Sequence, residues 1–189
     1  MKVFISFFIV LIFSSAVAFG QEMDESDFLF SKNLNTVHKN PSQTKRVADY
    51  LLKNAQTDIE KAEAFYLLSE SEKKQGNYIE SIEHLFKAKT LVDPKKDHFL
   101  NSLLLISIAQ QCRSTGINDI SEKYLNKAVA QISLITENEE LIIAKAALRY
   151  EQADNLLVKG SIVEAKEVAK TSESILHNAE KELPALLIK

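Results

Sequence analysis

The chain has 189 residues, 46% hydrophobic and 26% charged, with a net charge of −3 at pH 7. This is the ordinary composition of a globular domain, and the abundance of Leu, Ile, Ala, Glu and Lys favours helices. The mild acidity argues against a nucleic-acid-binding protein, which would need a clustered basic face. Because Cys112 is the only cysteine, no internal disulfide can form, and we expect it to be a buried small hydrophobic residue.

Residues 1–20 have the three-part layout of a signal peptide. A single charge at Lys2 precedes a long apolar run, and small residues follow. Cleavage before Phe19 and cleavage before Gln21 both fit the pattern. We therefore expect an exported protein, periplasmic or secreted, that meets the membrane only if the leader is uncleaved. Residues 21–27 are polar and acidic, which predicts a flexible start.

Residues 28–57 predict a degenerate first helical hairpin. Apolar residues from Phe28 to Val37 indicate one helix, which ends before Pro41. Ser42 is the expected N-cap of the next helix. That second helix carries small and apolar residues at Ala48, Leu52 and Ala55.

Residues 62–94 predict two amphipathic helices joined by a tight turn at Gly76-Asn77. Phe65 and Leu68 share one face of the first helix. The second carries an apolar stripe at helical spacing, which consists of Tyr78, Ile82, Leu85, Ala88 and Leu91. Neither helix can bury its stripe alone, so each hairpin needs a neighbour.

The same pattern recurs around Gly116 and Gly160. With the three glycines aligned, every residue in three further columns is Ala or Ser, where helices must approach closely. The column seven before the glycine holds Ser69, Ala109 and Ala153; the column five after it holds Ser81, Ser121 and Ala165; the column twelve after it holds Ala88, Ala128 and Ser172.

These columns resemble the tetratricopeptide repeat (TPR), which has a large residue early in its first helix, a glycine at the turn and small residues in both helices. Residues 62–94 match well, with Phe65 at the first large position and Asp93-Pro94 at the end. The spacing of 40 and then 44 residues exceeds the usual 34, which predicts longer helices or connections. In the later copies, Leu105 and Arg149 stand at the early aromatic position.

The resemblance implies an all-α fold, a right-handed superhelical solenoid of about four antiparallel helix pairs. We place the three TPR-like hairpins at about 58–94, 97–136 and 137–182, followed by a C-terminal tail at 183–189. No polar capping helix is visible after the third hairpin. We therefore expect self-association or partner binding through that hairpin, whose last helix carries an apolar set at Ile162, Val163, Val168, Ile175 and Leu176.

The family's concave face implies a binding site for a protein or peptide. At the family's offsets from the turn glycine, this face comprises Tyr66, Glu70, Lys73, Ile106, Gln110, Arg113, Tyr150 and Asp154. An alternative interpretation places Tyr66, Ile106 and Tyr150 in the packed interface between helices. The carboxylate clamp of some family members is not matched, because Tyr66 and Glu70 replace its Lys and Asn.

No catalytic or metal-binding pattern stands out. The sequence has no Gly-rich phosphate loop, nucleophile elbow or paired-carboxylate motif, and the four histidines are expected to be solvated or interfacial. Glu70 with Lys74 forms an i, i+4 pair typical of an exposed helix. We therefore expect no enzyme activity and no cofactor. The alternative is the extracytoplasmic sensor part of a bacterial membrane-bound regulator, which the long repeats and leader also resemble.

Overall fold

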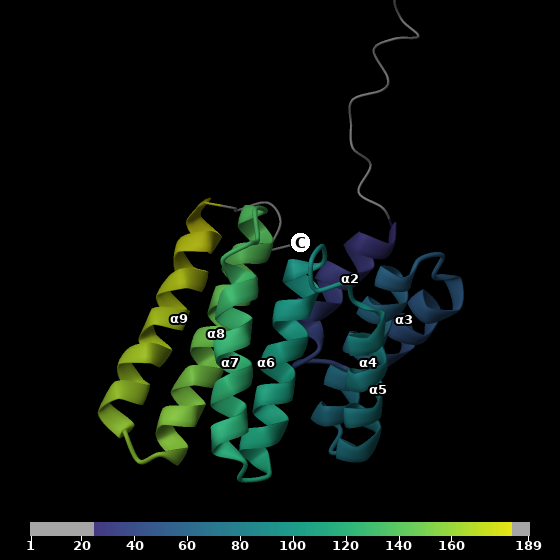
Figure 1. Ribbon diagram of the computed structural model, residues 1–189. Coiled ribbons are helices and arrows are strands. Elements are labelled where there is room, and N and C mark those ends of the chain that lie inside the picture. Colours follow the sequence, from purple (N-terminus) through teal and green to yellow (C-terminus); the bar gives the residue numbers. More distant parts are fainter. Residues whose placement is uncertain (1–24, 183–189) are drawn as a thin grey trace, which may run out of the picture.

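The structure is a computed structural model that describes residues 25–182, and within this range its only regular elements are helices (Figure 1). This confirms the all-α prediction for the described residues. The helices in chain order are α2 (Glu25–Thr36), α3 (Pro41–Asn54), α4 (Asp58–Lys74), α5 (Tyr78–Leu91), α6 (His98–Ser114), α7 (Asn118–Ile132), α8 (Asn138–Val158) and α9 (Ile162–Glu182). The predicted signal peptide and C-terminal tail lie outside the described residues. Helix α2 already includes residues 25–27, which we had predicted to be flexible.

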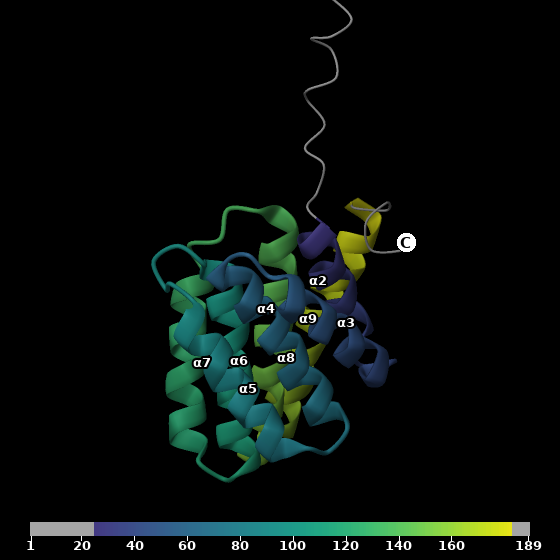
Figure 2. The same ribbon diagram turned by 90° about the vertical axis from the view of Figure 1, so that its right-hand side faces the viewer.

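Consecutive helices pair as antiparallel hairpins. Helices α4 and α5, α6 and α7, and α8 and α9 pack most extensively, and their three connecting turns lie at the same end of the molecule (Figures 1 and 2). Helix α8 also packs against α6 and α7, while α3 packs more closely against α4 than against α2. This arrangement is consistent with a helical solenoid. None of the helices within residues 25–182 is both long and apolar enough to cross a membrane.

The three glycine turns have the same backbone structure. Gly76, Gly116 and Gly160 have φ of 84°, 79° and 81°. Each glycine N–H donates to the carbonyl three residues earlier, and the next N–H donates to the carbonyl five residues before it, as in Ile117 N to Cys112 O at 2.8 Å. This is the Schellman motif, which ends a helix with a left-handed residue.

Glycine is needed at these turns for its backbone conformation and not for close packing. A Cβ built on any of the three would meet no atom within 4 Å. The close approach that we expected at the small residues therefore does not extend to the glycines. A residue with a side chain would be strained there by the positive φ alone.

The Ala and Ser columns are buried between helices. All nine residues are between 0% and 6% exposed. The serines also find hydrogen-bond partners: Ser69 Oγ and Ser81 Oγ lie 3.2 Å apart, and Ser172 Oγ donates to Ala146 O at 2.9 Å. These small side chains let the paired helices approach while leaving no buried hydroxyl unpaired in these contacts.

Two details of the first hairpin correct the sequence analysis. Pro41 occupies the first turn of α3, so the N-cap is Asn40 and not Ser42; Asn40 Oδ1 accepts from Gln43 N at 3.3 Å. The buried positions of α3 are Thr44, Ala48 and Leu51. These three residues have the same spacing as the buried residues of α5. They lie one helical turn earlier in the chain than the residues predicted to be buried, because the α2–α3 turn also comes earlier than predicted.

Helix α4 begins with a capping box. Thr57 Oγ1 accepts from Glu60 N at 3.3 Å, and Glu60 Oε2 accepts from Thr57 N at 2.9 Å. In α5, Tyr78 is 60% exposed and does not belong to the apolar stripe. It is the first residue of α5, directly after the turn.

Candidate functional site

The first helices of the three glycine hairpins line a cavity of about 520 Å³. Its walls come from α4, α6 and α8, and His38 before α3 and Ser172 of α9 also line it. Seven of the eight predicted concave-face residues line it: Tyr66, Glu70, Lys73, Ile106, Gln110, Tyr150 and Asp154. We call this cavity the inner groove. The eighth residue, Arg113, is not among the lining residues but bonds to two of them.

The three predicted anchors of the groove differ in exposure. Tyr66 and Ile106 are each only 7% exposed, so for them the alternative interpretation, a place in the packed interface, describes the structure. The ring of Tyr66 also meets Phe30 of α2 edge-on, with ring centroids 6.4 Å apart. Tyr150 is 61% exposed. The inner groove therefore has a buried apolar floor and one exposed aromatic ring.

Polar side chains in the groove bond first to one another. Lys73 Nζ donates to Glu70 Oε1 and to Gln110 Oε1, each at 2.6 Å, and Ser107 Oγ donates to Glu70 Oε1 at 2.8 Å. These bonds tie α4 to α6. The predicted exposed pair of Glu70 with Lys74 is wrong, since Glu70 is only 8% exposed and pairs with Lys73.

An equivalent set of bonds ties α6 to α8. Arg113 donates from Nε to Glu151 Oε1 at 2.6 Å and from Nη2 to Asp154 Oδ2 at 2.8 Å. Lys73 and Arg113 both stand three residues before a turn glycine, and their partners Gln110 and Asp154 both stand six before the next. We call this repeated arrangement the polar ladder; its members are Glu70, Lys73, Ser107, Gln110, Arg113, Glu151 and Asp154.

Burial and pairing set the charge of the ladder carboxylates. Burial raises the pKa of Glu70, but the charge and hydrogen bond of Lys73, with the hydrogen bond of Ser107, outweigh it, so the pKa is lowered. For Glu151 burial dominates over the pairing with Arg113, and the pKa is raised. The pKa of Tyr66 is raised by burial and by the nearby Glu70. Glu70 is thus a stable anion, while Glu151 is the ladder carboxylate that protonates more easily.

Sequence reasoning missed two ladder members and two further lining residues of the groove, His38 and Lys74. Ser107 and Glu151 stand nine residues before their glycines, three before the predicted Gln110 and Asp154, and so on the same helix face. That spacing was a usable signal. His38 and Lys74 line the groove from the α2–α3 turn and the end of α4. Their approach depends on how the first hairpin packs, which the sequence did not indicate.

A second cavity, of about 380 Å³, is lined by acidic residues from three helices. Asp27 of α2, Glu63 of α4 and Glu139 and Glu140 of α8 line it, with Glu137 just before α8. Burial and the surrounding carboxylates, with Asp27 the first of them, raise the pKa of Glu63 to about 8. This acidic cavity adjoins Phe30 and Phe99 and lies toward the start of α8.

Other residues with reactive side chains are placed as packing or surface groups. Cys112 is half-buried against the core, and burial raises its pKa. His84 stacks on Phe65 with ring centroids 5.9 Å apart, and His98 Nδ1 lies 2.9 Å from Gln131 Oε1. Among the described residues no group of three or more His, Cys, Asp or Glu side chains is placed to hold a metal ion.

Comparisons of the chain with protein-family models, with curated proteins and with solved structures found no match.

Proposed function

We propose that this chain is an exported scaffold of the tetratricopeptide type, a right-handed superhelical solenoid that binds a protein or peptide and catalyses no reaction. The observation that carries the proposal is the inner groove itself. Seven of the residues expected at the family's ligand-facing positions, drawn from three hairpins, line one cavity. The leader pattern in residues 1–20 supports export.

The chemistry of the inner groove suits a peptide chain. An exposed tyrosine beside a buried apolar floor is a typical anchor for a partner's side chain. The Gln110 amide, whose oxygen accepts from Lys73, retains N–H groups that could pair with a peptide backbone. Because the charged side chains of the polar ladder are already paired with one another, the groove is preorganised. Binding then costs little side-chain entropy.

The proposal is tested by selecting binders and mapping them to the groove. A random peptide library displayed on phage would be selected against the mature protein, and the recovered peptides measured by calorimetry. Tyr150→Ala should weaken them by about tenfold or more, the effect of losing an aromatic anchor. Tyr78→Ala is the matched control, because Tyr78 is equally exposed at 60% but lies outside the groove.

Two results would contradict the proposal. One is a library that yields no binder above background. The other is a set of binders that Tyr150→Ala and Tyr78→Ala weaken equally, since their site would then lie elsewhere on the molecule.

A further inference from the structure

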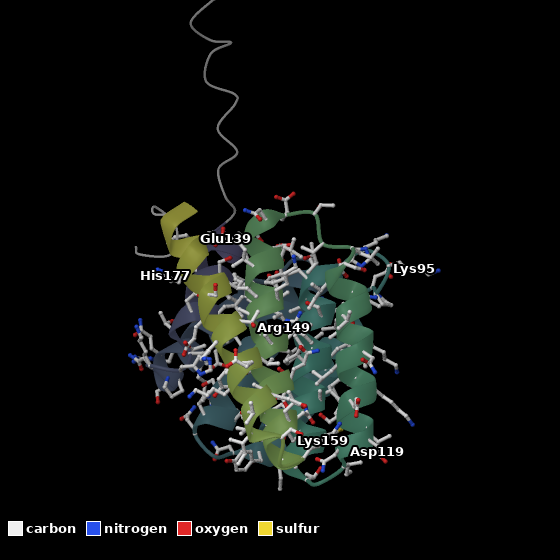
Figure 3. The ribbon with its side chains drawn as sticks, turned by 90° about the vertical axis from the view of Figure 1, so that its left-hand side faces the viewer. Lys95, Asp119, Glu139, Arg149, Lys159 and His177 are labelled. Carbon is white, nitrogen blue, oxygen red and sulfur yellow. The ribbon has the colours of Figure 1, made fainter. Side chains whose placement is uncertain are left out.

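A second groove runs between α7 and α9, on a different face from the inner groove. Two cavities of about 790 and 270 Å³ lie along it, and both are lined by Arg149 and Gln152 of α8. Figure 3 shows Arg149 of α8 with α7 and α9 on either side. We call this the α7–α9 groove.

The larger cavity has apolar walls and no acidic lining residue. Its apolar residues are Val129, Ile132, Ile135, Leu141, Leu148 and Ile175. Val129 at its rim is 44% exposed, and neighbouring Leu134 is 53% exposed. Its charged lining residues, Lys145 and Arg149, are both cations, and Arg149 Nη1 donates to Gln152 Oε1 at 3.1 Å. An occupant must therefore be largely apolar, and it binds most tightly if it offers hydrogen-bond acceptors to these two cations.

We propose that the α7–α9 groove is the docking site for residues 183–188 of the same chain. These residues are Leu, Pro, Ala, Leu, Leu and Ile, an uncharged apolar run that lies outside the described residues and follows α9 directly. Their backbone carbonyls are acceptors of the kind that Lys145 and Arg149 require. Pro184 favours departure from the helix at this point.

The geometry allows this docking. The end of α9, the start of α8 and the end of α7 lie at the same end of the molecule (Figure 1). Ile175, which lines the larger cavity, is seven residues before the end of α9, or about 10 Å along its axis. Six extended residues reach roughly 20 to 22 Å, enough to turn back and cross one helix spacing.

A segment of the same chain is favoured over other occupants by its connection. A tether this short corresponds to a millimolar local concentration, so the segment competes strongly against a second copy or a foreign peptide. An occupied α7–α9 groove would also leave the inner groove as the face open to a partner.

Disulfide trapping on the full chain tests the proposal. In a Cys112→Ser background, Val129→Cys would be combined in turn with cysteine at 185, 186, 187 or 188, and oxidation followed by mass spectrometry. The matched control replaces Val129→Cys by Ile79→Cys, because Ile79 is 73% exposed on α5 and far from the groove. Circular dichroism would verify that each variant is folded.

We expect at least one Val129 pair to form an intramolecular disulfide about tenfold faster than any Ile79 pair. Equal rates for the two sets would overturn the proposal. So would disulfides that form only between chains, because a second copy's segment would then fill the groove.

Discussion

At the scale of single residues, the strongest constraints lie in the glycine turns. Gly116 has a φ of 79° with open space around it, so a side chain there is opposed by backbone strain and not by a clash. Gly116→Val should lower the free energy of unfolding by ~1 to 3 kcal/mol. Gly116→Asn should cost less, because asparagine tolerates the left-handed region better. Thermal melts would contradict the repeat register if Gly116→Val melted at the same temperature as the parent, or if Gly116→Asn were the less stable variant.

The Glu63 carboxyl gives a prediction about pH. Its pKa of about 8 lies above the ordinary value of 4.5, so the folded state holds this proton more tightly than the unfolded chain. Its contribution to stability is therefore fully present below pH 4.5 and is lost as the pH rises to about 8. Glu63→Gln should remove this loss, raising the free energy of unfolding at pH 9 by about 2 to 4 kcal/mol but changing little at pH 4.

Glu60, three residues earlier, gives a prediction of the opposite sign. Backbone hydrogen bonds from Thr57 and Gln56 lower the pKa of Glu60, so its contribution is present at neutral pH and lost as the pH falls. Glu60→Gln should therefore destabilise at pH 7. Denaturant melts from pH 4 to pH 9 would measure both variants. A Glu63→Gln curve parallel to that of the parent would show that Glu63 ionises normally.

Arg113 holds two carboxylates of α8, one of them deeply buried. Glu151 is 2% exposed, and removing the guanidinium leaves it uncompensated beside Asp154. Arg113→Met should cost ~3 to 5 kcal/mol at pH 8. The loss should shrink as the pH falls, because a protonated Glu151 needs no cation. Lys159→Met breaks only the exposed pair with Glu122 and should cost less than ~1 kcal/mol. Equal losses in urea melts would mean that the ladder is not a buried network.

At the scale of helices, packing of the small-residue columns separates buried from outer faces. Ala128 of α7 is fully buried, so Ala128→Leu should overpack and cost ~1 to 3 kcal/mol. Glu122, on the same helix, is exposed and pairs only with the exposed Lys159, so Glu122→Ala should change stability by less than ~1 kcal/mol. Similar melting temperatures for the two variants would show that the faces of α7 are wrongly assigned.

Much of the helix pattern was predictable, because local signals agree with one another in the glycine hairpins. The turn glycines, the apolar spacing and the small columns all follow from the chain near each turn, so α6 and α8 begin within a residue of the predicted starts of their hairpins. The first hairpin has no turn glycine, and its register was misplaced by a helical turn. There Asn40 and Pro41 fix the start of α3, and α3 packs mainly on α4.

The positions of the candidate-site residues were predictable, but their hydrogen bonds and pKa values were not. Family offsets identified residues that line one cavity. The sequence near each residue did not indicate that Lys73 bonds to Gln110, or Arg113 to Asp154, across helices. Those bonds depend on how neighbouring hairpins stack. The high pKa of Glu63 likewise arises from burial and then from Asp27 and Glu140, residues distant in sequence. Such effects appear only once the tertiary arrangement is known.

At the scale of the whole molecule, stability should fall toward the third hairpin. Within the described chain, α8 and α9 have a neighbouring hairpin on one side, formed by α6 and α7, which themselves lie between two hairpins. In a structure held by nearest neighbours, such a hairpin opens first. Amide hydrogen exchange on residues 21–189 should therefore be faster in α9 than in α6. Exchange that is as slow in α9 as in α6 would show that the number of neighbouring hairpins does not set the stability of this end.

The same end also offers apolar surface for self-association. Ile162 and Val163, at the start of α9, are 68% and 78% exposed, more than a terminal helix usually leaves in water. We expect sedimentation to show association at high concentration and Ile162→Glu with Val163→Glu to abolish it. Ile79→Glu is the control, since Ile79 is 73% exposed at the equivalent turn of the first glycine hairpin. A parent chain that stays monomeric at high concentration would exclude this face as a self-association site. If Ile79→Glu abolished association equally, the contact would instead involve the glycine turns of all three hairpins.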